Sequence, residues 1–290
     1  MSTNITIQPA MTFVVADGIN TSYIDSTLMS LFYKSSHLQE MLAQQPDKAE
    51  FIYLQEMISN NFIDLARRNF SIDSSIVNEI RNYSLVCGWK PSSNITELFS
   101  VVDYLTFLMT GFNFGGIKME IVEISDRDEE VRVLNFNYIE AQVYDEDNID
   151  HLLKKWLEGC TKKTKPLSTI HYRFAELPMI IPIYINRHTG KDITNTSQID
   201  IFKKIKFRKN NDKTQDSASW IIHSIICLSS SGSGHYYSLI QVDNNDWYLF
   251  SNARIPSLVK IRISDPDVAL KIKKECVLIL YRLSDDLCKY

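Results

Sequence analysis

The first part of the chain carries apolar residues at the spacing expected of helices. Hydrophobic side chains recur three or four positions apart over Ile24–Phe32, Tyr53–Phe70 and Leu98–Met109. This spacing places them on one face of a helix, where they can pack against a core. A glycine-containing stretch, residues 111–116, follows the third segment and interrupts the pattern. We therefore expect a helical region that ends near residue 116.

After Ile117 the pattern changes from helical to strand-like. Residues 119–124 and 131–134 are rich in branched side chains, which favour strands, and the acidic run Asp126–Glu130 predicts a solvated hairpin turn between them. One further helix is expected over Asp147–Cys160, because its apolar residues share a face. Beyond it we expect strands at Pro178–Asn186, Trp220–Leu228, Tyr236–Val242, Trp247–Phe250 and Val277–Arg282.

This order of elements predicts an α+β protein. Residues 1–116 would form a helical lobe and residues 117–290 a β-rich lobe, with the cleft between them as the default place for a site. The length of 290 residues fits one large domain or two of ordinary size. The net charge of -4 argues against a dedicated nucleic-acid binder, which usually carries a basic excess.

The apolar runs argue against a membrane span, and the cysteines indicate a reducing compartment. The longest apolar run, near Leu177–Ile185, is interrupted by prolines and is shorter than the roughly 20 residues that a bilayer span needs. The N-terminal residues lack the features of a signal peptide. The 5 cysteines include no Cys-x-x-Cys pair, which argues against a disulfide framework and against a thiolate zinc site. We expect a cytoplasmic protein with no membrane contact, no metal and no other cofactor.

The segment around His235 has the pattern of a hairpin that could carry chemistry. Gly234 frees the backbone before His235, a strand follows, and an aromatic strand returns after a polar turn and ends at Phe250. In such a hairpin the residue after Phe250 lies beside His235, so Ser251 or Asn252 could fix the tautomer and orientation of the imidazole. The alternative is a histidine with no catalytic role at a hairpin edge.

A second segment, Asp17–Leu28, runs from a turn into a helix. Gly18 and Asn20 favour the turn, and the helix is expected to begin near Ser22. A nucleophile at a helix N-terminus lies in positive potential, which favours an anionic sulfur or oxygen. The alternative for Ser22 is an ordinary N-capping serine that pairs with Asp25, three residues further on.

Together, the two segments resemble the Cys box and the His box of the ubiquitin-specific proteases, a papain-like family of deubiquitinating enzymes. Ser22 stands at the position of the nucleophilic cysteine, and Tyr23–Leu28 is similar to the cylindromatosis branch of the family. Between the boxes, Glu176–Arg187 resembles the family's Leu-Pro strand. The residues that match the boxes are Asn20, Thr21, Tyr23 and Leu28 in the first, and Gly234, His235, Tyr236, Trp247, Tyr248 and Phe250 in the second.

The resemblance implies a papain-like fold with a helical thumb, a β-rich palm and short fingers that lack zinc. It implies a deubiquitinase that hydrolyses the bond after the C-terminal Gly-Gly of ubiquitin. A cysteine at position 22 would attack the glycine carbonyl and His235 would act as the base, with Ser251 or Asn252 orienting it. The implied partners are ubiquitin, polyubiquitin and ubiquitinated proteins.

Further roles follow from the same resemblance. Asp17 aligns with the oxyanion-hole asparagine of the family, but an ionised carboxylate cannot donate a hydrogen bond. The backbone amide of Ser22, helped by Asn20, would then stabilise the oxyanion. Asp103 would pair with an arginine of the ubiquitin tail, the alternative being a solvated carboxylate on a helix. A narrow tunnel for the glycines of the tail would be lined by Gly234, Tyr236 and Tyr237.

The serine at position 22 leaves three interpretations open. It is an engineered replacement of cysteine, which we favour, or it marks a natural pseudoenzyme that binds ubiquitin, or it marks a serine-dependent enzyme. The degenerate tail-binding helix around Asp103 keeps open a protease for a ubiquitin-like modifier, such as SUMO, the NEDD-type modifier or the interferon-induced one. The richness in Ile and Asn suggests a viral or pathogen protein that acts on host ubiquitin in the host cytoplasm or nucleus.

Overall fold

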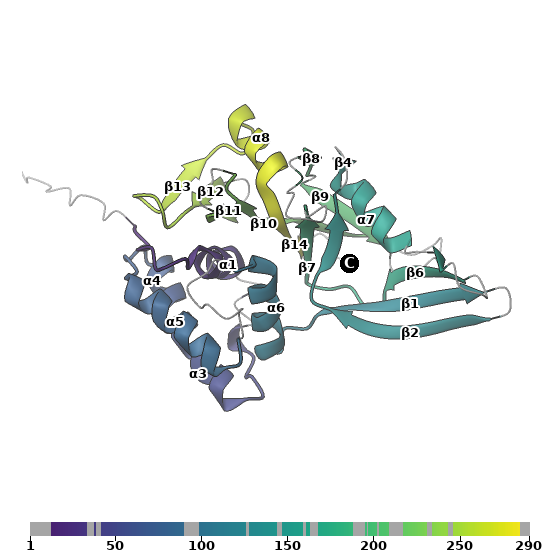
Figure 1. Ribbon diagram of the computed structural model, residues 1–290, viewed down its shortest axis with the longest axis horizontal. Coiled ribbons are helices and arrows are strands. Elements are labelled where there is room, and N and C mark those ends of the chain that lie inside the picture. Colours follow the sequence, from purple (N-terminus) through teal and green to yellow (C-terminus); the bar gives the residue numbers. More distant parts are fainter. Residues whose placement is uncertain are drawn as a thin grey trace, which may run out of the picture.

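A computed structural model gives the fold of the chain (Figure 1). Most helices precede residue 117 and most strands follow it. None of the helices in the described ranges has the length and apolar character needed to cross a bilayer. The residues that the structure describes are 13–33, 38, 42–89, 99–125, 128–143, 147–158, 161–162, 168–187, 195, 197–201, 203–208, 217–230, 234–242 and 246–284.

The helices of the first part include all three that the apolar spacing predicts. They are α1 (Ser22–Phe32), α3 (Ala49–Met57), a π-helical segment (Ile58–Ile63), α4 (Asp64–Arg67), α5 (Ser74–Val86) and α6 (Val101–Gly111). The second expected helix is the continuous run of α3, the π-helical segment and α4. The third, α6, begins later than expected, and Leu98 lies outside the described residues. α5 was not predicted, because few apolar residues mark its buried face.

Side-chain caps explain where α5 and α6 begin. Asp73 accepts a hydrogen bond from the amide of Ser75 at 2.8 Å and caps α5. Ser100 accepts one from the amide of Asp103 at 3.4 Å and caps α6. The carboxylate of Asp103 in the first turn also suits the positive end of the helix dipole. The position of Asp103 in the fold is therefore set by the start of α6.

The central sheet contains the five strands that the sequence predicts after residue 177. Its strands are β3 (Ile139–Gln142), β7 (Ile180–Asn186), β9 (Lys204–Arg208), β10 (Ser217–Leu228), β11 (Tyr236–Val242), β12 (Asp246–Phe250), β13 (Leu258–Ile261) and β14 (Cys276–Leu283). Their order is β13-β12-β11-β10-β14-β7-β3, and β9 also pairs with β10. Neighbouring strands are antiparallel except β3 and β7.

The expectation of strands alone after residue 177 is wrong at α8 (Pro266–Glu275). Asp265 accepts a hydrogen bond from the amide of Asp267 at 3.0 Å, and Pro266 occupies the first turn. Both features are typical helix starts. Of the residues of α8, Ile272 is buried, so the hydrophobic pattern is weak. The capping residues, rather than the apolar spacing, mark this helix in the sequence.

A second, four-stranded sheet, here called the outer sheet, has the order β2-β1-β6-β5. Its strands are β1 (Ile117–Ser125), β2 (Glu129–Phe136), β5 (Thr161–Lys162) and β6 (Ser168–Phe174). β1 and β2 form the expected hairpin, although residues 126–127 of its turn lie outside the described residues. On α7 (Ile149–Glu158), Trp156 stacks on Tyr172 of β6 with ring centroids 4.7 Å apart. Figure 1 shows this sheet extending away from the helices of the first part, and a short pair, β4 (Asp147–Asn148) and β8 (Ile199–Asp200), lies apart from it.

α1 packs against the central sheet and joins the two parts of the molecule. Every residue of α1 is buried. Tyr23 of α1 belongs to the same core cluster as Ile240 of β11 and Phe250 of β12. The hydroxyl of Ser224 in β10 donates to the backbone carbonyl of Ser30 at 3.0 Å. These contacts hold the N-terminus of α1 beside the start of β11.

Candidate active site

The side chain of Ser22 lies at the N-terminus of α1, and the residue is 2% exposed. Ser22 is the first helical residue and Thr21 is the N-cap residue, so the N-capping interpretation of Ser22 is wrong. Its Oγ instead accepts a hydrogen bond from the backbone amide of Tyr236 at 3.2 Å. This amide and the positive end of the helix dipole both favour negative charge at the Oγ position. Position 22 therefore suits an anionic nucleophile.

His235 stands directly before β11, where the preceding residue gives the backbone its freedom. Gly234 has a φ of 60°, a left-handed conformation that glycine adopts without strain. The register of β11 and β12 brings the residue after β12 beside the imidazole. As a result, His235 Nε2 lies 3.2 Å from Ser251 Oγ. Of the two candidates for orienting the ring, the structure places Ser251 there and not Asn252.

The surroundings of His235 favour a neutral imidazole. Burial lowers its pKa below the ordinary value, and the nearby Asp17 carboxylate opposes this shift. A neutral ring is the form that a general base needs. With Nε2 engaged by Ser251, Nδ1 is the nitrogen left to take a proton. Within the described ranges no hydrogen bond joins Ser22 to His235; the two are linked through the backbone amide of Tyr236.

Asn252 contacts two carboxyl groups instead of the histidine. Its Nδ2 donates to Asp17 Oδ1 at 3.0 Å and also to Asp25 Oδ2. Thr21 Oγ1 donates to the same oxygen of Asp25 at 3.2 Å. Asp17, Thr21, Asp25 and Asn252 are called the polar network below. Asn252 directly follows Ser251 in the loop after β12. By fixing this loop, the network also fixes Ser251, which contacts the imidazole of His235.

Asp25 was expected only as a capping partner of Ser22, and the structure places it in the polar network instead. It is 0% exposed, and its Oδ1 has no hydrogen-bond partner among the described residues. Burial raises its pKa well above the usual range and Asp17 adds to the rise, against the lowering effect of hydrogen bonds from Thr21 and Asn252. A neutral, protonated acid fits this position. The sequence signal that could have indicated this role is an acidic residue, Asp25, within an apolar helix whose residues are all buried.

The turn before α1 carries the two residues that were expected near the oxyanion. Asp17 and Asn20 both reach solvent and line a cavity beside His235. Asp17 accepts its hydrogen bond from Asn252, in keeping with a carboxylate that does not donate. Asn20 has a φ of 53°, which asparagine tolerates better than most residues. Arg81 Nη1 donates to the carbonyl of residue 19 at 2.6 Å and holds the turn in place.

The cavity beside His235 has a volume of about 640 Å³. Part of its lining comes from the site just described, and part comes from β11, the loop after β12 and α8. This volume lies in the range of pockets that bury most of a small ligand. The residues of the site that line it are Asp17, Asn20, His235 and Ser251.

Tyr236 and Tyr237 lie on opposite faces of β11. Successive side chains of a strand alternate between its two faces. Tyr236 is 8% exposed and belongs to the core cluster shared with α1, whereas Tyr237 lines the cavity. The hydroxyl of Tyr237 donates to Glu275 Oε2 at 2.7 Å. The structure therefore separates two residues that were expected to line one tunnel.

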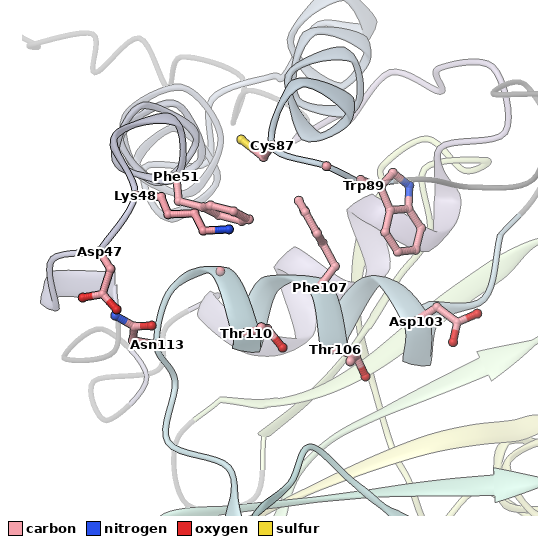
Figure 2. Close-up of a pocket in the computed structure, with 12 residues that line it drawn as sticks. Asp47, Lys48, Phe51, Cys87, Trp89, Asp103, Thr106, Phe107, Thr110 and Asn113 are labelled. Carbon is pink, nitrogen blue, oxygen red and sulfur yellow. The ribbon is translucent and has the colours of Figure 1, made fainter.

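Asp103 lies on α6, away from the cavity beside His235. It lines a second cavity of about 580 Å³ between α3 and α6 together with Phe51 and Phe107, and Figure 2 shows its side chain at one end of that cavity, pointing away from theirs. The charge of Asp103 contributes, behind burial, to the raised pKa of Tyr184 and of Tyr236. Tyr184 lies on β7 and Tyr236 on β11 of the central sheet.

The described cysteines are free thiols. Cys227 and Cys276 are buried, and Cys87 is partly buried. Cys160 and Cys288 lie outside the described residues. Within the described part of the chain, no group of three or more His, Cys, Asp and Glu side chains is placed to hold a metal ion.

Comparisons with known proteins give a relationship in fold alone. No family model matches the chain, and no curated protein does so either. Among solved structures, the chain is similar to the SAGA DUB module of Ubp8, Sgf11, Sus1 and Sgf73 bound to monoubiquitin. The match has a TM-score of 0.68 at 13% sequence identity and covers 97% of this chain and 72% of that one. The protein is therefore a mixed helical and β-sheet protein with a fold like that of a ubiquitin-specific protease.

Proposed function

We propose that this protein is a deubiquitinase that hydrolyses the isopeptide or peptide bond after the C-terminal Gly-Gly of ubiquitin. One observation carries the proposal: two segments far apart in the sequence meet where Ser22 Oγ accepts the amide of Tyr236 at 3.2 Å, directly beside His235. The similarity of the fold to a DUB module bound to monoubiquitin supports it. We infer that the native nucleophile is a cysteine at position 22 and that the chain with Ser22 is inactive.

In the proposed reaction, His235 Nδ1 takes the proton of a thiol at position 22, and the sulfur attacks the carbonyl carbon of the terminal glycine. The carbon–nitrogen bond then breaks. The lysine amine leaves with the proton from His235, and a glycyl thioester remains. Water that gives a proton to His235 attacks this thioester and releases the ubiquitin carboxylate and the thiol. Ser251 holds the ring through Nε2 in both halves of the reaction.

The same groups explain why a serine would be slow at this position. A thiol is a few per cent ionised near pH 7, whereas a hydroxyl stays protonated and needs stronger help from its base. Ser251 orients His235 without a negative charge, so it stabilises the imidazolium less than a carboxylate does. The developing oxyanion would meet the backbone amide of Ser22 and the side chain of Asn20. These donors favour the transition state but do not ionise a serine.

For substrate binding, two carboxylates favour a tail that carries arginines. Behind burial, the charges of Glu140 and Asp103 both contribute to the raised pKa of Tyr184 and of Tyr138, and the two tyrosine rings lie with their centroids 5.9 Å apart. Arginine pairs well with carboxylates and with the faces of tyrosine rings. We propose that the Leu-Arg-Leu-Arg-Gly-Gly tail of ubiquitin passes between α6 and the central sheet here. Asp103 is the residue that the family resemblance implies for this role, and Glu140 is a second carboxylate that we add to the proposal.

The remaining expectations are part of the same proposal. The outer sheet would take the place of the fingers of the ubiquitin-specific proteases, without zinc. The protein would act in the cytoplasm, or in the cytoplasm or nucleus of a host if it comes from a virus or an intracellular pathogen. The neighbourhood of its gene tests the origin, and metal analysis of the purified protein tests the absence of zinc.

The deciding experiment replaces Ser22 and offers several modifiers. The Ser22→Cys variant should release a fluorescent dye from the C-terminus of ubiquitin, while the chain with Ser22 should not. The matched control is Ser26→Cys, which adds a thiol one turn further along α1 at a residue that is 1% exposed. Dye conjugates of SUMO, the NEDD-type modifier and the interferon-induced modifier are measured in parallel.

Each result decides between the alternatives. Turnover of ubiquitin by Ser22→Cys and not by Ser26→Cys supports the proposal. Turnover of a ubiquitin-like modifier alone would replace ubiquitin as the substrate. Binding of ubiquitin without turnover by either variant would make the protein a ubiquitin-binding pseudoenzyme. Equal turnover by the chain with Ser22 would mean that the serine itself is the nucleophile.

A further inference from the structure

We propose that the cavity beside His235 holds the polypeptide that carries the leaving lysine, and that Arg254 and Lys271 make this cavity prefer acidic residues next to that lysine. The inference rests on the proposed function. It adds a specificity for the acceptor side of the cleaved bond, which the ubiquitin side does not determine.

The position of the cavity separates it from the proposed path of the ubiquitin tail. Its lining contains Tyr237 and His235 but neither Tyr236 nor Asp103. Since the two tyrosines project from opposite faces of β11, the tail and the leaving group can lie on opposite sides of the strand. If the ubiquitin tail runs beside Asp103 and Tyr236, the cavity stays available for the lysine amine that leaves. His235 lines this cavity, so it can return its proton to an amine bound there.

The acids of the cavity are already engaged by neighbours. Glu275 accepts hydrogen bonds from the hydroxyl of Tyr237 at 2.7 Å, from the hydroxyl of Ser230 at 2.6 Å and from the amide of Ser230 at 3.2 Å. Burial alone would raise the pKa of Glu275, but these hydrogen bonds and the charge of Lys271 outweigh it and lower the pKa. Asp17 accepts from Asn252. These hydrogen bonds come from neutral groups and leave the charges in place, but they occupy both oxygens of Glu275 and one oxygen of Asp17.

The cations of the cavity are not engaged in the same way. Arg254, in the loop after β12, and Lys271, on α8, are exposed and line the cavity. Within the described part of the chain, neither side chain makes a hydrogen bond or a close ion pair, although Lys271 acts on Glu275 at longer range. Two cations at the mouth of a cavity attract carboxylates of a bound segment. An acceptor peptide with acidic residues beside its lysine therefore fits best.

The expected preference is moderate, because these side chains are exposed. A solvent-exposed ion pair changes an equilibrium by roughly two- to fivefold, so two pairs give about tenfold at low salt. The preference should weaken as salt is added, because exposed charges are screened. A neutral leaving group too small to reach the two cations should be indifferent to them.

The test compares substrates that share ubiquitin and differ in the leaving group. The Ser22→Cys variant is given ubiquitin with a small neutral dye, ubiquitin linked to a lysine flanked by glutamates, and ubiquitin linked to a lysine flanked by arginines. The same set is measured with Arg254→Glu and Lys271→Glu added together. Lys274→Glu is the matched control, since it reverses a charge on α8 at an exposed residue outside the cavity.

We expect kcat/KM to be about tenfold higher for the glutamate-flanked peptide than for the arginine-flanked one at low salt. The double charge reversal should invert this order and leave dye release within about twofold, whereas the control should do neither. Equal kcat/KM for the two peptides, or an equal loss on dye and peptides after charge reversal, would overturn the inference and leave the proposed function intact. No dye release would overturn the proposed function and the inference with it.

Discussion

Two regions of the molecule use their polar side chains in opposite ways. In the polar network beside α1, Asp25 is 0% exposed and Asn252 is 6% exposed, and each is held by specific hydrogen bonds. The outer sheet carries its charges at half-buried and exposed positions. Its ion pairs include Arg173 with Glu120 at 3.3 Å, Arg173 with Glu129 at 3.5 Å and Arg132 with Glu123 at 3.8 Å.

The difference in burial implies that substitutions in the two regions change the free energy of unfolding by different amounts. Leaving a buried polar group without its partner costs about 1–3 kcal/mol, whereas an exposed ion pair is worth about 0–1 kcal/mol. The polar network should therefore decide where Ser251 and His235 of the candidate site lie, and the outer sheet should tolerate substitution. β2 carries exposed apolar residues such as Val131 and Val133. The stability of this strand therefore does not depend on burial of all its apolar side chains.

The largest contrast is expected at the group that the polar network positions. In the Ser22→Cys variant, His235→Ala should lower kcat/KM for ubiquitin with a dye by a factor of about 10² or more, because the base is lost. The matched control is His171→Ala, which removes a histidine from β6 in the outer sheet. Activity should be unchanged in the control. Near-full activity of the His235→Ala form would refute its role as the base.

A smaller but still large effect is expected when the network itself is broken. Asn252→Ala removes the Nδ2 group that serves both Asp17 and Asp25. We expect the free energy of unfolding, measured with urea, to fall by about 1–3 kcal/mol, because Asp25 loses a buried donor. Asn135→Ala, at an exposed position of β2 in the outer sheet, is the control and should stay within about 0.5 kcal/mol. An equal effect at both positions would remove the distinction between the regions.

The sequence predicts the parts of the site that depend on local pattern. Two short strand patterns around a polar turn predict the hairpin of β11 and β12. The same pattern predicts that the residue after β12 lies beside His235. Ser251 was one of two candidates because sequence pattern alone does not say which of two neighbouring residues faces the ring. In the structure Ser251 faces the ring, and Asn252 faces Asp17 and Asp25.

The network was not predictable, because it depends on how α1 packs against the sheet. Asn252 and Asp25 are 227 positions apart in the chain, and no local rule brings them together. The same is true of the amide of Tyr236 and Ser22, which are 214 positions apart. Helices α5 and α8 were missed for another reason: their apolar faces are narrow and their caps carry the signal.

The pH dependence of stability sharpens the comparison at Asp25. Its pKa is raised in the folded protein, mainly by burial, so the folded state prefers the protonated form. The contribution of Asp25 to stability is therefore complete below its pKa in the unfolded chain, near 3.8. This contribution is lost as the pH rises through its pKa in the folded protein. Asp25→Asn should keep the hydrogen-bond geometry and remove this dependence, so its advantage over the parent should grow as the pH rises above 4.

Urea unfolding of the Asp25→Asn variant and its parent across pH 4 to 8 measures this difference. Asp25→Ala is the second variant, because it removes the acceptor for Thr21 and Asn252 and should destabilise the protein at every pH by about 1–3 kcal/mol. If Asp25→Asn is instead less stable than the parent and the gap widens with pH, the carboxyl is ionised in the folded protein. The polar network would then be held by charge rather than by neutral hydrogen bonds.

The smallest effect is expected in the outer sheet, at Arg132. Its side chain is 51% exposed and lies 3.8 Å from Glu123 and 3.7 Å from Glu130. Arg132→Met keeps the apolar stem that covers the strand and removes the charge, so the free energy of unfolding should fall by less than about 0.5 kcal/mol. The loss should vanish in 1 M salt, where the charges are screened, whereas the loss in Asn252→Ala should persist. A double-mutant cycle with Glu123→Gln isolates the pair. A coupling energy above about 1 kcal/mol would place this ion pair with the polar network and show that exposure does not separate the two regions.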